Sequence, residues 1–363
     1  MSEAGTRPES EALLRASSME PSGVISPPET PAPAEGSNAA LPEDFGGEQE
    51  PEAGTLVVSL LTPVSVTMLL VVLLVAEMQS ASQQIQGSFS ELMVYQEDTE
   101  HDSASTIAGG VLLNGAAVVL MLFLVTTCLL GLYKYRCYIL IYMWLFFSVC
   151  SLLGLFGGFV LQQLFEMHDV PIDTISYLFF LYNFAAGGTI LVFWTEYGLG
   201  PNPPLQMQQS YLVVISALLA WSATRTPEWT TWGLLGAVAV WDLIAVLTPR
   251  GPLKLLVEEA ERRNEPIPGL VYQSAHHIKL GLGDFVFYSV LVGRASMHGA
   301  APMWVCAVAV LAGLCATLAL LPILQRVLPA LPISIAVGIG FYFVSAWALS
   351  PLAHQLAAAR VVL

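Results

Sequence analysis

Two aspartates stand inside long apolar runs of the sequence, where a charged side chain is costly. Asp242 lies in the run 237–245, and Asp284 lies in the run 281–287. An ionisable side chain at the centre of a membrane helix costs at least about 2.5–3.5 kcal/mol. Neither run contains a lysine or arginine that could neutralise the charge. The two aspartates therefore need a chemical or structural explanation.

The chemistry that fits such a pair is peptide hydrolysis. Two carboxyl groups about 3 Å apart cannot both ionise, so one keeps a proton and the other acts as a base. The base would deprotonate a water that attacks the peptide carbonyl, and the acid would protonate the leaving nitrogen. Two other interpretations stay open on these residues alone. The carboxyls could form a hydrogen-bonded clamp between helices, or a proton or cation relay of the kind found in transporters.

Other hydrolytic chemistries lack their motifs in this sequence. There is no HExxH zinc helix and no GxSxG nucleophile elbow. His276 and His277 are adjacent, so they cannot share a helical face as zinc ligands four residues apart do. We therefore expect no metal and no cofactor.

The rest of the chain must place the aspartates in a membrane. Hydrophobic residues make up 55% of the chain and charged residues 11%, whereas a soluble domain carries about 25% charged residues. The apolar residues form blocks long enough to cross a hydrocarbon core about 30 Å thick. In lipid each backbone group must pair within its own segment, so these blocks predict helices and an all-α polytopic membrane fold. Nine transmembrane helices are predicted, at 56–76, 107–132, 138–165, 175–195, 205–224, 229–247, 278–293, 303–324 and 331–349.

Charge distribution predicts the orientation and the domain organisation. Residues 1–54 hold eleven acidic residues against Arg7 and Arg15 and are rich in proline, which predicts a disordered cytosolic tail before the nine-helix domain, 55–363. With nine spans and the amino terminus in the cytosol, ten of the 13 lysines and arginines face the cytosol. This asymmetry favours a short cytosolic loop at 248–279 and a lumenal carboxyl terminus. The chain has no basic patch, which argues against nucleic-acid binding.

Three motifs around the aspartates resemble those of one family. The run WDLIAVLTPRGPL at 241–253 resembles the sixth helix of presenilins and its cytosolic exit. LGLGDFVFYS at 280–289 resembles the presenilin GxGD signature, and PALP at 329–332 resembles the PAL motif before the last helix. The similarity extends from about residue 56 to the carboxyl terminus. It implies an intramembrane aspartyl endopeptidase, the catalytic subunit of a γ-secretase complex, with Asp242 and Asp284 as the catalytic pair.

The residues beside the pair are expected to support substrate binding. Glycines next to Asp284 would let a substrate backbone or a partner helix approach closely. Two prolines bracket the PAL motif, which predicts non-helical backbone with unpaired groups beside a water-filled cavity. The usual family tyrosine before the first aspartate is replaced here by Trp241, which could change substrate positioning. The expected supporting residues are Trp241, Lys279, Gly281, Leu282, Gly283, Pro329, Ala330 and Leu331.

The resemblance also implies partners and a location. The partners would be nicastrin, the anterior-pharynx-defective protein and the presenilin enhancer, in endoplasmic-reticulum and Golgi membranes. The run 182–184, Tyr-Asn-Phe, resembles the family's Trp-Asn-Phe site for the enhancer. Substrates would be single-span membrane proteins in the lipid bilayer, adding an extended strand beside 270–273 and 278–280. The alternatives are a signal-peptide-peptidase-like protease of inverted topology and a non-proteolytic cation-leak or scaffold protein.

Overall fold

The computed structural model describes residues 53–78, 93–97, 102–194, 205–248, 251–263, 270–273, 279–324 and 330–358. The predicted tail, apart from its last two residues, lies outside this range, as do Pro329 and the two adjacent histidines. The elements are helices α1 (Ala53–Glu77), α3 (Ala104–Lys134), α4 (Tyr138–Ser151), the π-helical turn η1 (Leu152–Phe156), α5 (Gly157–Met167), α6 (Thr174–Val192), α7 (Leu205–Ala223), α8 (Glu228–Leu247), α9 (Pro252–Arg263), α10 (Leu282–Ser296), α11 (Ala300–Leu324) and α12 (Ala330–Ala358), with strands β1 (Val271–Gln273) and β2 (Lys279–Gly281).

Six helical stretches within the described residues are long and apolar enough to cross a membrane. They are Val57–Glu77, Ala104–Lys134, Tyr138–Met167, Thr174–Val192, Ala300–Leu320 and Leu331–Ala348. The third combines α4, η1 and α5 into one rod, as a single predicted span requires. The other three predicted spans coincide with α7, α8 and α10, which are helical but are not among the six stretches found within the described residues. The count of nine spans stays a prediction.

A two-stranded antiparallel pair interrupts the helices in the part of the chain that the structure describes, so the expectation of helix throughout 278–293 is wrong at its start. β1 and β2 are antiparallel, with Tyr272 opposite Leu280. Residues up to Gly281 are therefore held extended by pairing with β1, and α10 begins only at Leu282. The apolar run 278–293 cannot reveal where the helix begins. The pairing that keeps β2 extended involves β1, which lies outside that run.

The hairpin is joined firmly to α10. The Leu282 N–H donates to the Leu270 carbonyl at 3.4 Å. Tyr272 is buried, and its ring centroid lies 5.2 Å from that of Phe285. The extended segment thus leads directly into the helix that carries Asp284.

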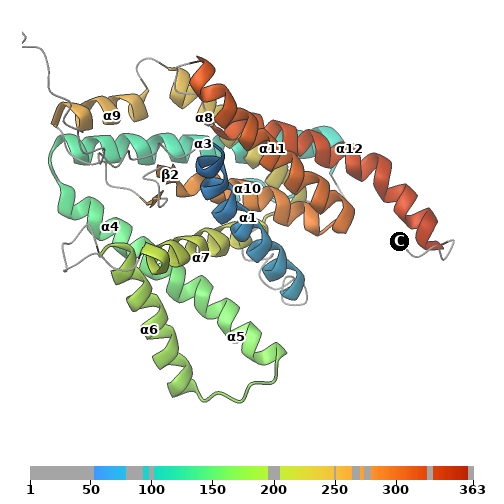
Figure 1. The fold of residues 1–363 in the computed structure, drawn as a ribbon, viewed down its shortest axis with the longest axis horizontal. Helices are drawn as coiled ribbons and strands as arrows, with labels where there is room; N and C mark the ends of the chain where they lie inside the picture. Colours follow the sequence, from blue (N-terminus) through green and yellow to red (C-terminus); the bar gives the residue numbers. More distant parts are fainter. Residues whose placement is uncertain are drawn as a thin grey trace, which may run out of the picture. The chain divides into compact units, whose positions relative to one another are not determined.

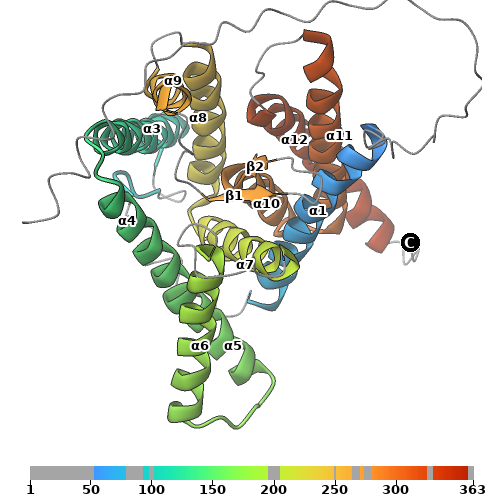
Figure 2. The same ribbon diagram turned by 60° about the vertical axis from the view of Figure 1, so that its left-hand side comes forward.

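Helix α10 lies at the centre of the packed helices, between α1, α7, α11 and α12 (Figures 1 and 2). Every residue from Tyr288 to Ala295 is buried. Gly283, Asp284 and Phe287, near the start of the helix, remain partly or fully accessible. The helix is therefore anchored in the core along most of its length and open beside its aspartate.

Helix α9 follows α8 and docks on the turn between α3 and α4. The Arg263 guanidinium donates to the Tyr133 carbonyl at 3.0 Å and to the Lys134 carbonyl at 3.2 Å. These carbonyls belong to the last turn of α3, where partners come from outside the helix. The Tyr133 carbonyl also accepts from the Arg136 N–H at 3.1 Å. Ala260 is buried against Tyr133 and Ile141. The predicted loop 248–279 therefore contains a helix with a fixed docking site.

Candidate active site

The two aspartates lie on different helices, and their charges interact. Asp242 is on α8, five residues before its end at Leu247, and Asp284 is the third residue of α10. Both side chains are partly accessible. Their carboxyl groups lie close enough to interact electrostatically. Their pairing as the two catalytic carboxyl groups stays a prediction.

A third helix reaches the same place through the PAL segment. The backbone N–H of Leu331 hydrogen-bonds to the Asp242 carboxylate, and the Leu331 side chain is buried. The expectation that this segment is non-helical is wrong, because α12 begins at Ala330 and includes Pro332. Amide groups in the first turn of a helix have no intrahelical acceptor, so a proline there removes no bond. For the same reason the Leu331 N–H, in the first turn of α12, has no acceptor within its helix and can donate to the Asp242 carboxylate.

Tyr288 and Ser334 join this group of residues, and the sequence does not single them out. Tyr288 lies one turn after Asp284 on α10, is fully buried, and interacts electrostatically with both aspartates. Its hydroxyl hydrogen-bonds with Ser334, one turn into α12. The available signal is the spacing of four residues, which puts Tyr288 on the same helical face as Asp284. The bond ties α10 to α12 directly behind the aspartates.

The two glycines of the GxGD motif border open space. A Cβ atom built on Gly281 would meet nothing within 4 Å, and one on Gly283 would meet only a ring carbon of Phe287 at 3.9 Å. Neither glycine is needed for close packing of a partner helix. Leu282 between them is buried and anchors the turn. The glycines leave room beside Asp284 on the accessible side of α10.

The remaining expected residues lie around this centre with different roles. The Trp241 ring packs edge-on against Phe123 of α3, with centroids 6.0 Å apart, so it contributes to packing between α3 and α8. Lys279 pairs with Gln273 in the hairpin. Ala330 is the first residue of α12, and Pro329 lies outside the described residues.

Filling the open space at Gly283 should separate folding from cleavage. We expect Gly283→Leu to keep the melting temperature of the protein, because leucine is a better helix former than glycine and its Cβ would meet only a Phe287 ring carbon, at 3.9 Å. The same side chain obstructs the approach to Asp284, and a misplaced substrate costs on the order of 10²-fold in rate. Thermal unfolding and initial cleavage rates measure the two effects. Gly131→Leu in α3, where a Cβ also meets nothing within 4 Å, is the control. Equal rates for the two variants would contradict a substrate path beside Gly283.

Comparison with known proteins places the chain in a family. The family model for presenilin matches residues 52–278 and 273–353. Presenilin-B of Dictyostelium discoideum is 39% identical, over 88% of this chain and 68% of the relative. The presenilin-like protein At2g29900 of Arabidopsis thaliana is 34% identical, over 80% of this chain and 92% of the relative. Presenilin sel-12 of Caenorhabditis elegans is 32% identical, over 83% and 87%. With its aspartates on α8 and α10 and its PAL segment at the start of α12, the chain belongs to the presenilin family.

Proposed function

We propose that the chain is an intramembrane aspartyl endopeptidase that cuts the transmembrane segments of single-span membrane proteins. The observation that carries the proposal is the electrostatic interaction of Asp242 with Asp284, together with the hydrogen bond from the Leu331 N–H to Asp242. Three separate helices contribute to this centre, as expected of a site assembled for chemistry. Membership of the presenilin family supports the same activity.

In the proposed mechanism the two carboxyl groups share one proton and titrate as a unit. The ionised carboxylate takes a proton from water, and the resulting hydroxide attacks the peptide carbonyl. The protonated carboxyl gives its proton to the developing oxyanion, which yields a gem-diol. As the carbon–nitrogen bond breaks, the carboxyl that took the water proton passes it to the leaving nitrogen, and a diol hydroxyl returns a proton to the other carboxylate. The Leu331 N–H orients the Asp242 carboxylate. The bond between Tyr288 and Ser334 holds the helices of the two motifs together behind the pair.

The hairpin offers a way to present the substrate. A two-stranded sheet has open edges, and an extended peptide can add to such an edge through backbone hydrogen bonds. Gly281, the last residue of β2, stands only three residues before Asp284. A substrate helix that unwinds beside the hairpin would therefore bring an extended peptide bond to the aspartates.

The proposed enzyme works as the catalytic subunit of a γ-secretase-like complex in endoplasmic-reticulum and Golgi membranes. The partners proposed from the family resemblance are nicastrin, the anterior-pharynx-defective protein and the presenilin enhancer. Tyr182 on α6 is 71% exposed, while Asn183 donates to the Phe179 carbonyl of its own helix. The Phe184 ring lies against Gly157 and Tyr211. Tyr182 and Asn183 are the exposed residues of this motif, and we propose that the Tyr182 ring contacts the enhancer.

The test uses the purified complex in proteoliposomes, with cleavage and cation flux measured on the same vesicles. We expect defined cleavage of a single-span substrate with a short ectodomain, identified by mass spectrometry. Cation flux without cleavage would overturn the protease proposal in favour of the leak alternative. Cleavage of signal peptides alone would favour the protease of inverted topology.

The orientation gives an independent prediction. A protease-sensitive tag at the amino terminus should be digested from the cytosolic side of intact microsomes, and one at the carboxyl terminus should be protected. The reason is that this arrangement puts ten of the 13 lysines and arginines on the cytosolic face. Digestion of both tags after detergent treatment is the control. A protected amino terminus would assign the opposite orientation.

A further inference from the structure

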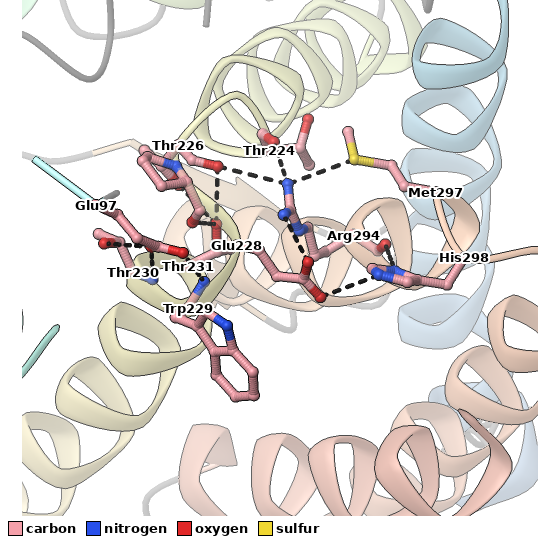
Figure 3. Close-up of polar contacts among 11 residues, drawn as sticks. Glu97, Thr224, Thr226, Glu228, Trp229, Thr230, Thr231, Arg294, Met297 and His298 are labelled. Carbon is pink, nitrogen blue, oxygen red and sulfur yellow. Dashed lines mark hydrogen bonds and ion pairs between the residues drawn. The ribbon is translucent and has the colours of Figure 1, made fainter. Parts of the chain in front are cut away.

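A polar cluster joins the ends of α8 and α10 that lie far from the aspartates (Figure 3). Glu228 is the first residue of α8, and Arg294 and His298 stand at the end of α10 and just beyond it. His298 Nε2 lies 3.0 Å from Glu228 Oε1, and Arg294 Nη2 lies 3.9 Å from Glu228 Oε2. We call these three residues the Glu228 clasp.

Arg294 extends the clasp to the turn between α7 and α8. Its guanidinium is buried, and Nη1 donates to the Thr224 carbonyl at 3.3 Å and to the Thr226 carbonyl at 3.4 Å. These carbonyls follow the end of α7, where the negative end of the helix dipole favours a cation. One side chain of α10 thus holds the turn that leads into α8.

The start of α8 is fixed from a second direction. Glu97 accepts hydrogen bonds from the backbone N–H of Trp229 at 3.4 Å and of Thr230 at 3.1 Å (Figure 3). Free N–H groups of a first helical turn are satisfied in this way by a capping carboxylate. The segment of Glu97 is itself bound to α3, because Asn114 exchanges two hydrogen bonds with the Tyr95 backbone. The clasp therefore acts on a helix end that is already held in place.

The clasp is a direct link between the two helices that carry the aspartates. The main packing partners of α8 are α3 and α12, while α10 packs against α1, α7, α11 and α12. At 1.5 Å per residue, Glu228 lies about 21 Å from Asp242 along α8, and Arg294 lies about 15 Å from Asp284 along α10. Because helices are stiff over such lengths, a displacement at the clasp moves the aspartates relative to each other.

We propose that Glu228, Arg294 and His298 are positioning residues, which set the spacing of Asp242 and Asp284 by holding α8 and α10 together at their opposite ends, and that the clasp closes when His298 is protonated. This inference rests on the proposed protease function for its catalytic consequence. Its structural part, the protonation-dependent closure, does not depend on that function.

The groups around His298 give the direction of the pH dependence. His298 faces Glu228 of α8, Arg294 of its own helix and Tyr342 of α12, whose ring centroid lies 5.7 Å away. Glu97 and Arg225 interact electrostatically with Arg294. The hydrogen bond to Glu228 raises the pKa of His298 above its ordinary 6.5, and the same bond lowers the pKa of Glu228 below 4.5.

The raised pKa of His298 and the lowered pKa of Glu228 together define the pH range in which the clasp is strongest. A raised histidine pKa stabilises the folded protein fully below pH 6.5, and this contribution is lost as the pH rises through the raised value. A lowered glutamate pKa stabilises fully above pH 4.5, and this contribution is lost as the pH falls through the lowered value. The clasp is therefore strongest between these two ordinary values. In the proposed orientation the clasp faces the lumen, whose acidity in endosomal compartments falls in this range.

The test compares His298→Gln with the unaltered chain, each assembled with its partner subunits. Thermal unfolding, kcat and KM are measured from about pH 5.5 to about pH 8.5, a range that spans histidine titration. We expect His298→Gln to lower kcat about tenfold at the acid end, as loss of a charged hydrogen bond does, with KM little changed. The ratio of the two kcat values should approach one at the alkaline end. The melting-temperature difference should shrink in the same direction.

Two further variants sharpen the test. His298→Lys keeps a positive charge at every pH used, so its kcat should stay near the acid-side level of the unaltered chain as the pH rises. His168→Gln is the matched control, because His168 is exposed just after α5 and its ring Nδ1 lies 3.0 Å from the Leu164 carbonyl of that helix, away from α8 and α10 in the chain. It should change neither quantity.

Each outcome decides one part of the proposal. A kcat ratio that stays constant with pH overturns protonation-dependent closure and leaves a static contact. A pH-dependent melting difference with equal kcat values overturns the positioning role alone. If the unaltered complex cuts no substrate, the protease proposal fails and the positioning role with it, while the melting difference still decides whether the clasp closes.

Discussion

Asp242→Asn and Asp284→Asn each abolish cleavage of a single-span substrate, with an expected loss of at least about 10²–10⁴-fold, the usual contribution of an acid or base catalyst. Asparagine can neither accept the proton of the attacking water nor donate one to the oxyanion. The variants should still fold, because removing a carboxylate from an apolar surrounding relieves a desolvation cost. Initial cleavage rates and thermal unfolding of purified complexes measure the two effects.

The matched control for this experiment is Asp173→Asn. Asp173 caps α6 by accepting hydrogen bonds from the N–H groups of Ile175 and Ser176, both at 3.1 Å. Asparagine caps a helix about as well as aspartate, so this variant should cleave at the normal rate. Near-normal cleavage by either Asp242→Asn or Asp284→Asn would show that the pair is not the acid and base of the reaction.

Gly338→Val should destabilise the protein by about 1–3 kcal/mol, the usual cost of overpacking a core. Gly338 lies on α12, where a Cβ atom would stand 2.6 Å from Leu291 Cδ2 and 2.7 Å from Val310 Cγ2. Valine would therefore force α12 away from α10 and α11. Because α10 carries Asp284 and α12 carries Leu331, we also expect cleavage to fall more than stability alone explains.

Gly340→Val isolates the packing effect. Gly340 lies on the same helix, and a Cβ there meets nothing within 4 Å. The cost of a β-branched residue in a helix is the same at both positions, so the difference between the two melting temperatures reports overpacking. Equal melting temperatures would mean that α12 does not approach α10 as closely as the structure has it.

The sequence predicts most of the helices because lipid imposes a simple rule. A long apolar segment must satisfy its own backbone, so hydropathy alone locates six helical stretches that meet the test of a membrane span. It also isolates Asp242 and Asp284, since charges are rare in such segments. What hydropathy cannot give is a boundary set by tertiary pairing. The start of α10 at Leu282 depends on β1, which lies eight or more residues earlier in the chain.

The surroundings of the aspartates are harder to predict for the same reason. Tyr288 and Ser334 look like ordinary packing residues in the sequence, and their hydrogen bond joins two separate helices. The docking of Arg263 on α3 and the bond from Thr230 to Glu97 connect residues more than a hundred positions apart. The error over the PAL segment has a local cause: proline excludes helix interior but not the first helical turn, where α12 begins.

The length of α10 has a consequence for the bilayer itself. Its 15 residues give a rod of about 22 Å at 1.5 Å per residue, shorter than the roughly 30 Å of hydrocarbon that a span must cross. The three residues of β2 add about 10 Å at 3.3 Å per residue, which makes up the difference. In the proposed nine-helix arrangement, hydrophobic mismatch at α10 is thus met by extended backbone rather than by more helix. Extended backbone at that depth must border protein or water. We therefore expect the bilayer to be thinned or hydrated on the side where Asp284 is accessible, and water for the proposed hydrolysis to enter there.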